Sequence, residues 1–274
     1  MLILLERRFA LQAHGTTVRT EVLAGLTTFL TMAYILFVQP VVLGAAGMDT
    51  GAVLVATCLA TALATLLMGL LANYPIAVAP AMGHNFFFAY TVVLGMKVPW
   101  PVALGAVGIA GGIFVLTAGI GLRERVIEAI PQGLKHAIAA GIGLLIATIG
   151  LQWAGVIVAA PGTLVTLGRL ERGPVLLALS GLAITSVLVA RRVPGAFLWG
   201  ILATTAGGVA AGFVRFDGAV SAPPSIVATF FRLDVAGALS VALLPVVLVF
   251  FFLAPFDSIG TLVGIRQQAG MTRG

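Results

Sequence analysis

Of the 274 residues, 60% are hydrophobic and 9% are charged, and the formal net charge is +6. Soluble domains contain about 25% charged residues, so this composition excludes a soluble enzyme or binding module, and its high apolar content excludes a disordered chain. Long uninterrupted apolar runs also exclude a transmembrane barrel, whose strands alternate at every second residue, and indicate a helical protein with several membrane crossings.

The N-terminal region 1–20 begins with four apolar residues that precede Glu6, Arg7 and Arg8. This order predicts an amphipathic interfacial helix and no cleaved signal peptide, because signal peptides carry their charges before the apolar run. Eight apolar segments follow, each with about the 20 residues needed to span a bilayer. They cover residues 22–46, 51–72, 76–96, 100–121, 135–153, 174–190, 194–213 and 236–256.

The basic residues lie in the short loops between these segments. With the N-terminus in the cytoplasm, ten Lys and Arg residues fall in inside loops and five in outside loops. This bias predicts a multi-pass protein of the inner (plasma) membrane with a cytoplasmic N-terminus, and it argues against nucleic acid as a partner. The single cysteine, Cys58, and the scattered histidines show no metal-ligand spacing, so neither a metal nor a cofactor is predicted.

The third segment departs from the helical pattern. Pro75 and Pro80 bracket a β-like run, and Pro80 disfavours helix around it. We expect an extended stretch followed by a half-helix that begins after Gly83, with Gly83 or Asn85 near its cap, and ends near Met96. Such broken helices in transporters direct their N-terminal dipole at the substrate. An ordinary proline-kinked helix is the alternative.

Asp257 follows about twenty apolar residues and precedes further apolar ones. A carboxylate within the membrane costs about 2.5–3.5 kcal/mol or more, so it requires a partner or a function. A helix-end carboxylate that reaches water is the alternative. In the first segment, Thr27, Thr28 and Thr31 either face a polar cavity or bond back to their own helix. The GxxxG pair Gly208 and Gly212 indicates helix packing.

Four blocks of sequence, residues 16–37, 51–96, 134–144 and 256–270, resemble the xanthine/uracil permease superfamily, most of all its purine branch. The resemblance implies fourteen membrane segments in two inverted repeats, divided into a core domain and a gate domain. Segments three and ten would pair as short antiparallel strands, and the substrate would lie between their half-helices and segment eight. The fold class that we expect is therefore an all-α polytopic membrane protein with the inverted-repeat transporter fold, truncated after segment eight.

The resemblance also implies the boundaries of the parts. They are a cytoplasmic amphipathic N-terminus (1–20), core-domain segments one to four (21–122), gate-domain segments five to seven (123–213), an extracellular loop (214–235), and core-domain segment eight with the C-terminal end (236–274). A chain of this extent is expected to insert into the membrane without transporting by itself.

The resemblance also implies roles for individual residues of this chain. Asp257, in Phe-Asp-Ser-Ile-Gly, resembles the acid that hydrogen-bonds the nucleobase, and Asn85, in Met-Gly-His-Asn, resembles the asparagine after the segment-three strand. The expected substrate site comprises Asp257, Asn85, Gly83, His84, Phe86 and Thr28, and Asp257 is also the candidate for ion coupling.

The chain departs from the purine branch at several of these places. Ala81, His84, Phe86 and Ala254 stand where that branch usually has other residues, and Gln39 precedes Pro40 where an asparagine is frequent. These departures weaken the assignment of a particular substrate more than the assignment to the transport class.

We therefore expect secondary-active transport of a nucleobase, with a purine preferred, by alternating access of the core domain against the gate domain. The expected partners are the nucleobase, protons or another coupling cation, and the lipid bilayer, and a homodimer is left open. An anion carrier of the sulfate or bicarbonate type is one alternative, which the Asp257 carboxylate disfavours. A non-transporting membrane fragment or assembly subunit is another. No enzyme is expected, because a single embedded acid makes no recognisable catalytic set.

Overall fold

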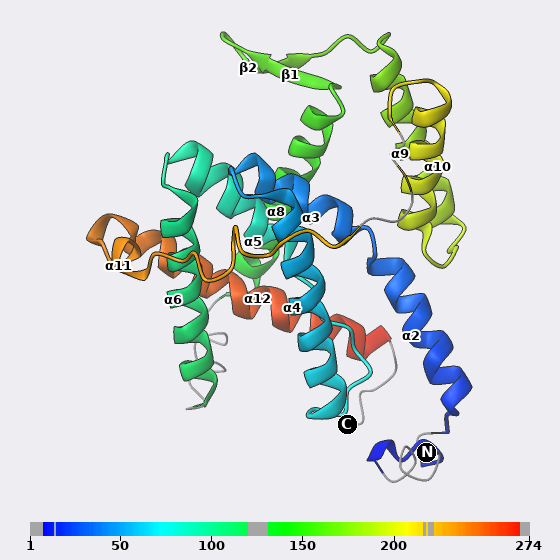
Figure 1. Ribbon diagram of the computed structural model, residues 1–274, viewed down its shortest axis with the longest axis vertical. Helices are drawn as coiled ribbons and strands as arrows, with labels where there is room; N and C mark the ends of the chain where they lie inside the picture. Colours follow the sequence, from blue (N-terminus) through cyan, green and yellow to red (C-terminus); the bar gives the residue numbers. More distant parts are fainter. Residues whose placement is uncertain (1–7, 14, 120–130, 216–217, 219–221, 269–274) are drawn as a thin grey trace. The chain divides into compact units, whose positions relative to one another are not determined.

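The computed structural model describes residues 8–13, 15–119, 131–215, 218 and 222–268, which are mostly helical (Figure 1). The helices are α2 (Val18–Met32), α3 (Ile35–Ala45), α4 (Thr50–Leu70), α5 (Met82–Phe86), the π-helix η1 (Phe87–Gly95), α6 (Trp100–Gly119), α8 (Gln132–Trp153), α9 (Gly173–Ala190), α10 (Ala196–Ala210), α11 (Val235–Ala238), the 3₁₀ turn η2 (Val241–Leu243) and α12 (Leu244–Gln268). One antiparallel hairpin joins α8 to α9; it consists of β1 (Ile157–Ala160) and β2 (Leu164–Leu167).

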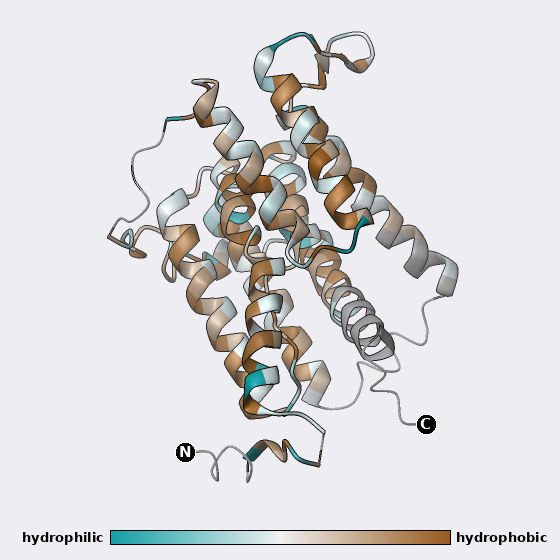
Figure 2. Cartoon of the chain, turned by 90° about the vertical axis from the view of Figure 1, so that its right-hand side faces the viewer, coloured by the Kyte–Doolittle hydropathy of each residue, from teal (hydrophilic) through white to brown (hydrophobic). Residues whose placement is uncertain are grey.

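Four helical stretches in the described ranges are long and apolar enough to cross a membrane: Val18–Ala45, which comprises α2 and α3, Thr50–Leu70, Trp100–Gly119 and Gly173–Ala190. Shorter apolar helices cover Gly143–Trp153, Ala196–Ala210 and Val241–Pro255. The helices are coloured mostly from brown to white, that is from hydrophobic to neutral, in Figure 2, as expected for elements whose surroundings are lipid. The chain is therefore a helical membrane protein, while the number of eight crossings stays a prediction.

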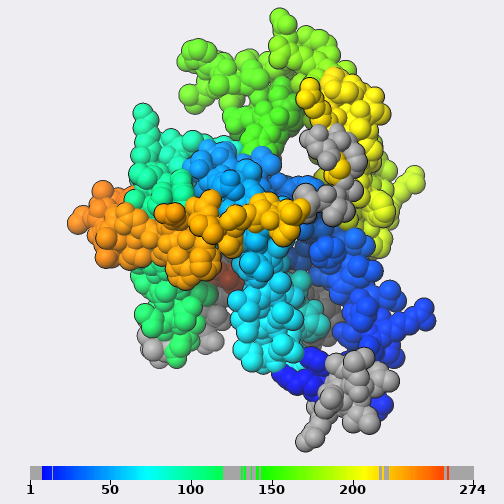
Figure 3. Space-filling view, viewed as in Figure 1, coloured from blue at the N-terminus to red at the C-terminus, as the bar shows by residue number. Residues whose placement is uncertain are grey.

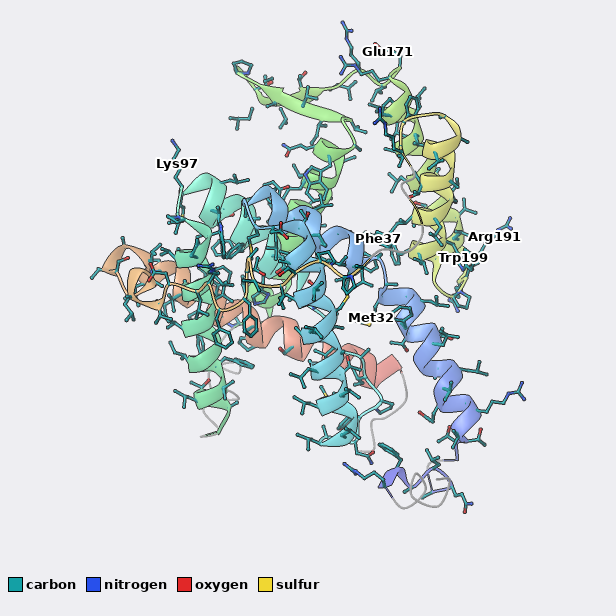
Figure 4. The ribbon with its side chains drawn as sticks, in the orientation of Figure 1. Met32, Phe37, Lys97, Glu171, Arg191 and Trp199 are labelled. Carbon is teal, nitrogen blue, oxygen red and sulfur yellow. The ribbon has the colours of Figure 1, made fainter. Side chains whose placement is uncertain are left out.

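Three exposed charged side chains lie next to the ends of α6 and α9. Lys97 precedes α6, Glu171 precedes α9 and Arg191 follows α9, and all three are exposed (Figure 4). This placement keeps their charges away from the apolar middle of each helix, as the sequence predicts for the loops of a membrane protein.

The chain divides into two compact units. The first comprises Met1–Val38, Leu54–Pro80 and Ile149–Pro224, and the second comprises Gln39–Val53, Ala81–Thr148 and Ser225–Gly274. The core-domain and gate-domain boundaries expected from the family stay a prediction.

In the first unit, α9 and α10 pack through a reciprocal pair of glycines and threonines. A Cβ atom on Gly181 would overlap Thr204 of α10, and a Cβ atom on Gly200 would overlap Thr185 of α9. Each threonine hydroxyl donates to the carbonyl of the glycine four residues earlier on its own helix, at 2.8 Å for Thr185 and 2.7 Å for Thr204. The two helices can therefore approach closely without leaving a hydroxyl unpaired in an apolar contact.

The expected GxxxG packing holds only in part. Gly208 lies close to Leu177 of α9 and to Val214, but no atom lies within 4 Å of the place where a Gly212 side chain would begin. Gly212 also has a φ of 73°, so its role is to allow the left-handed turn after α10. Spacing alone does not distinguish a packing glycine from a helix-ending one.

The second unit contains the packing of α6 against α11 and α12. A Cβ atom on Gly105 would overlap the carbonyl of Asp234, and the Asp234 N–H donates to the carbonyl of Pro101 at 2.8 Å. The space-filling view shows the α11 region lying against α6 (Figure 3). Buried side chains of this unit include Val42, Phe86, Val92, Ala106 and Phe250, so its core surrounds the second half of the broken third segment.

Two elements differ from the expectation. The first segment, expected to be one run over 22–46, is interrupted by a turn at Ala33 and Tyr34 between α2 and α3. The β1–β2 hairpin lies between the apolar segments 135–153 and 174–190, where no element was expected. Its signal was present in the sequence, because two short runs rich in β-branched residues flank Pro161 and Gly162.

Candidate functional site

The break in the third segment is confirmed. Residues 73–81 form no regular secondary structure, and α5 begins at Met82. The half-helix therefore begins within a few residues of Gly83, as expected, and its N-cap is Ala81, whose backbone is extended with φ −74° and ψ 112°. The methyl group of Ala81 cannot accept a hydrogen bond, so the first turn of α5 has no side-chain cap.

A threonine of α4 pairs with the backbone in the middle of the non-helical stretch. The Thr65 hydroxyl accepts from the Val78 N–H at 3.0 Å and donates to the Val78 carbonyl at 3.2 Å. One side chain thereby satisfies both backbone groups of a residue, as a neighbouring strand would do. This contact matters because unpaired backbone groups are costly in an apolar environment.

The half-helix places three of the expected site residues in one turn. Gly83, His84 and Asn85 are all half-buried in the second unit. The His84 ring stacks on Phe250 of α12, with ring centroids 6.4 Å apart and an interplanar angle of 17°, and Phe87 contacts the same ring edge-on at 5.1 Å. Phe250 therefore fixes the first turn of α5 and the start of η1 against α12.

Phe86 points into the core of its unit. It is 3% exposed and stacks on Tyr90 of η1, with ring centroids 5.9 Å apart. Its ring is therefore covered by neighbouring residues in this structure, and its expected contact with a base stays a prediction.

Asn85 reaches a residue that was not expected in the site. Its Nδ2 donates to Oε1 of Gln39 on α3 at 2.5 Å, although the two residues are 46 positions apart. Gln39 is 5% exposed. The signal for this partner was a carboxamide within an apolar run, directly before Pro40.

Thr28 lies in the first unit, apart in sequence from the α5 turn. Its exposed hydroxyl donates to the Ala24 carbonyl of the same helix at 2.9 Å, and Thr27 and Thr31 bond in the same way to Leu23 and Thr27. Of the two alternatives for these threonines, the structure shows the back-bonded one.

Asp257 lies in α12, two helical turns after Phe250. Its side chain is outside the described residues, and so is the side chain of His136. The expected proximity of Asp257 to the α5 turn therefore stays a prediction, supported by the contacts of Phe250 with His84 and Phe87.

Comparison with known proteins gives consistent results. A model of the Permease family, Xan_ur_permease, matches residues 19–273. The chain is 51% identical over 266 residues to "Putative permease MJ0326" of Methanocaldococcus jannaschii, and 48% identical over 269 residues to "Adenine permease AdeP" of Escherichia coli K12. It is 45% identical over 277 residues to "Guanine/hypoxanthine permease PbuG" of Bacillus subtilis 168.

These matches cover 97%, 98% and 97% of the chain, but only 61%, 60% and 63% of the three relatives. The chain thus spans about three fifths of the length of the curated relatives that it matches.

Proposed function

Because the chain belongs to the xanthine/uracil permease family, we propose that its gene product transports a nucleobase across the cell membrane, with a purine as the first candidate. The observation that carries this proposal is the similarity to adenine and guanine/hypoxanthine permeases over at least 97% of the chain. The broken third segment supports it, because non-helical backbone at membrane depth needs protein or a polar cavity around it.

The proposed site centres on the first turn of α5. Its uncapped backbone N–H groups donate to a base carbonyl or ring nitrogen, favoured by the helix dipole. Asn85 offers a neutral donor and acceptor beside them. Asp257 approaches from α12 and accepts N–H donors of the base, each worth about 1.5–3 kcal/mol net for a charged acceptor.

Asp257 also couples transport to a cation in this proposal. A protonated carboxyl accepts fewer hydrogen bonds than a carboxylate and can donate one, so the charge state of Asp257 alters its interaction with the base. Proton coupling then follows from binding of the base and of the proton at the same side chain. The core segments 21–122 and 236–274 move against the gate segments 123–213 to alternate access, with the N-terminus in the cytoplasm.

The test is uptake by cells that lack purine transport. The complete gene product is expressed in such a host, and uptake of labelled adenine, guanine, hypoxanthine and sulfate is measured. Saturable accumulation of at least one purine, competed by unlabelled purine and not by sulfate, is the expected result. Uptake of sulfate without any purine would instead assign the anion-carrier function.

A further inference from the structure

Gln39 is a buried polar side chain in an apolar helix. Gln39, Thr57 and Thr229 are the buried polar residues in the described ranges, and of these Gln39 lies in α3 next to Pro40. A buried carboxamide is unfavourable unless it is hydrogen-bonded. The hydrogen bond from Asn85 satisfies Oε1 of Gln39, so the position of α5 and the burial of Gln39 depend on each other.

The bond also determines how Asn85 presents its amide group. A carboxamide has two N–H donors and an oxygen that accepts up to two hydrogen bonds. Asn85 uses one N–H for Gln39, which leaves its other N–H and Oδ1 for a further partner. A free asparagine would rotate about its side-chain torsions, whereas this one is held by a buried partner from a different helix.

Buried or stacked neighbours restrict the motion of both Gln39 and Asn85. Val42, one turn after Gln39 on α3, is fully buried, and Phe86, directly after Asn85, is 3% exposed. His84, directly before Asn85, stacks on Phe250. Because both ends of the hydrogen bond are anchored, the orientation of the Asn85 amide is fixed before any ligand arrives, which reduces the entropy lost on binding.

We propose that Gln39 is a positioning residue for nucleobase recognition: it holds the Asn85 carboxamide so that the remaining N–H and Oδ1 of Asn85 face the base. The proposal rests on the proposed nucleobase transport. A base edge that carries a donor beside an acceptor is complementary to the N–H and oxygen of one carboxamide. Gln39 thus acts on the substrate through Asn85 and does not need to contact it.

The experiment is a double-mutant cycle in the complete gene product. Gln39→Met keeps the length and flexibility of the side chain and removes the acceptor, and Asn85→Ala removes the amide that is positioned. Nucleobase uptake gives KM and the maximal rate per protein in the membrane, and thermal unfolding in detergent gives stability. Gln152→Met, at an exposed position near the end of α8, is the matched control.

Gln39→Met is expected to raise KM up to about tenfold, the scale of one neutral hydrogen bond, with the maximal rate nearly unchanged. The double variant is expected to have the KM of Asn85→Ala alone, because Gln39 has nothing to position once the amide is gone. Gln39→Glu is expected to restore a KM near the native value, because a carboxyl oxygen accepts from Nδ2 in either charge state. Gln152→Met is expected to change none of these quantities.

Multiplicative effects of Gln39→Met and Asn85→Ala on KM would overturn the positioning role while leaving nucleobase transport in place. A Gln39→Met variant that loses stability and membrane abundance with an unchanged KM would assign Gln39 to helix packing instead. Absence of any nucleobase uptake by the unaltered protein would overturn the proposed function, and the positioning role with it.

Discussion

Asp257 is the residue whose charge matters most for the proposed recognition of a base. Asp257→Asn preserves the shape of the side chain and removes the negative charge. We expect it to abolish high-affinity uptake with normal membrane abundance, because the replaced acceptor is the strongest in the proposed site. Kinetics of labelled purine uptake, with abundance measured by immunoblot, check this outcome.

Asp234→Asn is the matched control for that variant. Asp234 caps α11 by accepting from the Gly237 N–H at 2.8 Å, and asparagine is an equally good N-cap residue. Its uptake should therefore stay native. If Asp257→Asn retained native affinity, Asp257 would be a helix-end carboxylate with no role in binding.

Also at the residue scale, the sequence predicted polar residues just after the break in the third segment but not their hydrogen-bond partners. Asn85 was predicted as a polar contact after the break, and it lies there. Its bond to Gln39 joins residues 46 positions apart, and such a contact depends on tertiary packing that no local pattern contains. Thr28, in contrast, makes a local hydrogen bond, because its hydroxyl donates to the Ala24 carbonyl of the same helix.

At the scale of elements, the extended stretch depends on Thr65. Thr65→Val keeps the shape of the side chain but removes the hydroxyl that bonds to the N–H and carbonyl of Val78. We expect a loss of about 1–3 kcal/mol of stability, the scale of an unsatisfied buried polar group, and a lower maximal uptake rate. Thermal unfolding of the purified protein, together with uptake, measures both.

Thr65→Ser retains the hydroxyl and should recover most of the stability. Thr148→Val is the control, because the Thr148 hydroxyl is exposed and bonds only to the Leu144 carbonyl of its own helix. Equal stability of the Thr65→Val and Thr148→Val variants would show that the stretch is held by other contacts.

The α9–α10 pair gives a second prediction at this scale. Gly200→Ala should destabilise the protein by about 1–3 kcal/mol, because the added methyl group overlaps Thr185 and overpacks the contact. Gly111→Ala should be neutral or slightly stabilising, because an added Cβ would meet no other described part of the chain within 4 Å and alanine favours a helix. The difference in unfolding temperature between the two variants is the measurement, and equal values would contradict the described packing.

The sequence predicted some secondary-structure elements and not others. Pro75 and Pro80 predicted the break because proline blocks helix by local sterics. The start at Met82 and the π-helical turns of η1 were not predicted, because hydrophobic periodicity does not distinguish neighbouring starts or helix types. The β1–β2 hairpin was not predicted, because its strands have four residues each and are far shorter than the apolar runs that identify membrane helices.

For the whole molecule, composition alone predicted the class. With 9% charged residues the chain has too little polar surface to cover a soluble fold, and the long apolar helices agree with that conclusion. Its family was recognisable because several blocks of sequence occur in the expected order. The division into core and gate domains and the inverted repeat stay predictions, since they concern the arrangement of whole groups of helices.

Nucleobase transport can be tested with purified protein in sealed liposomes. The complete gene product is reconstituted, an inward proton gradient is imposed, and entry of labelled adenine and hypoxanthine is followed. We expect saturable accumulation above the external concentration, which a protonophore abolishes and which the Asp257→Asn variant lacks. Liposomes that contain correctly inserted protein and take up neither purine above the protein-free background would contradict nucleobase transport.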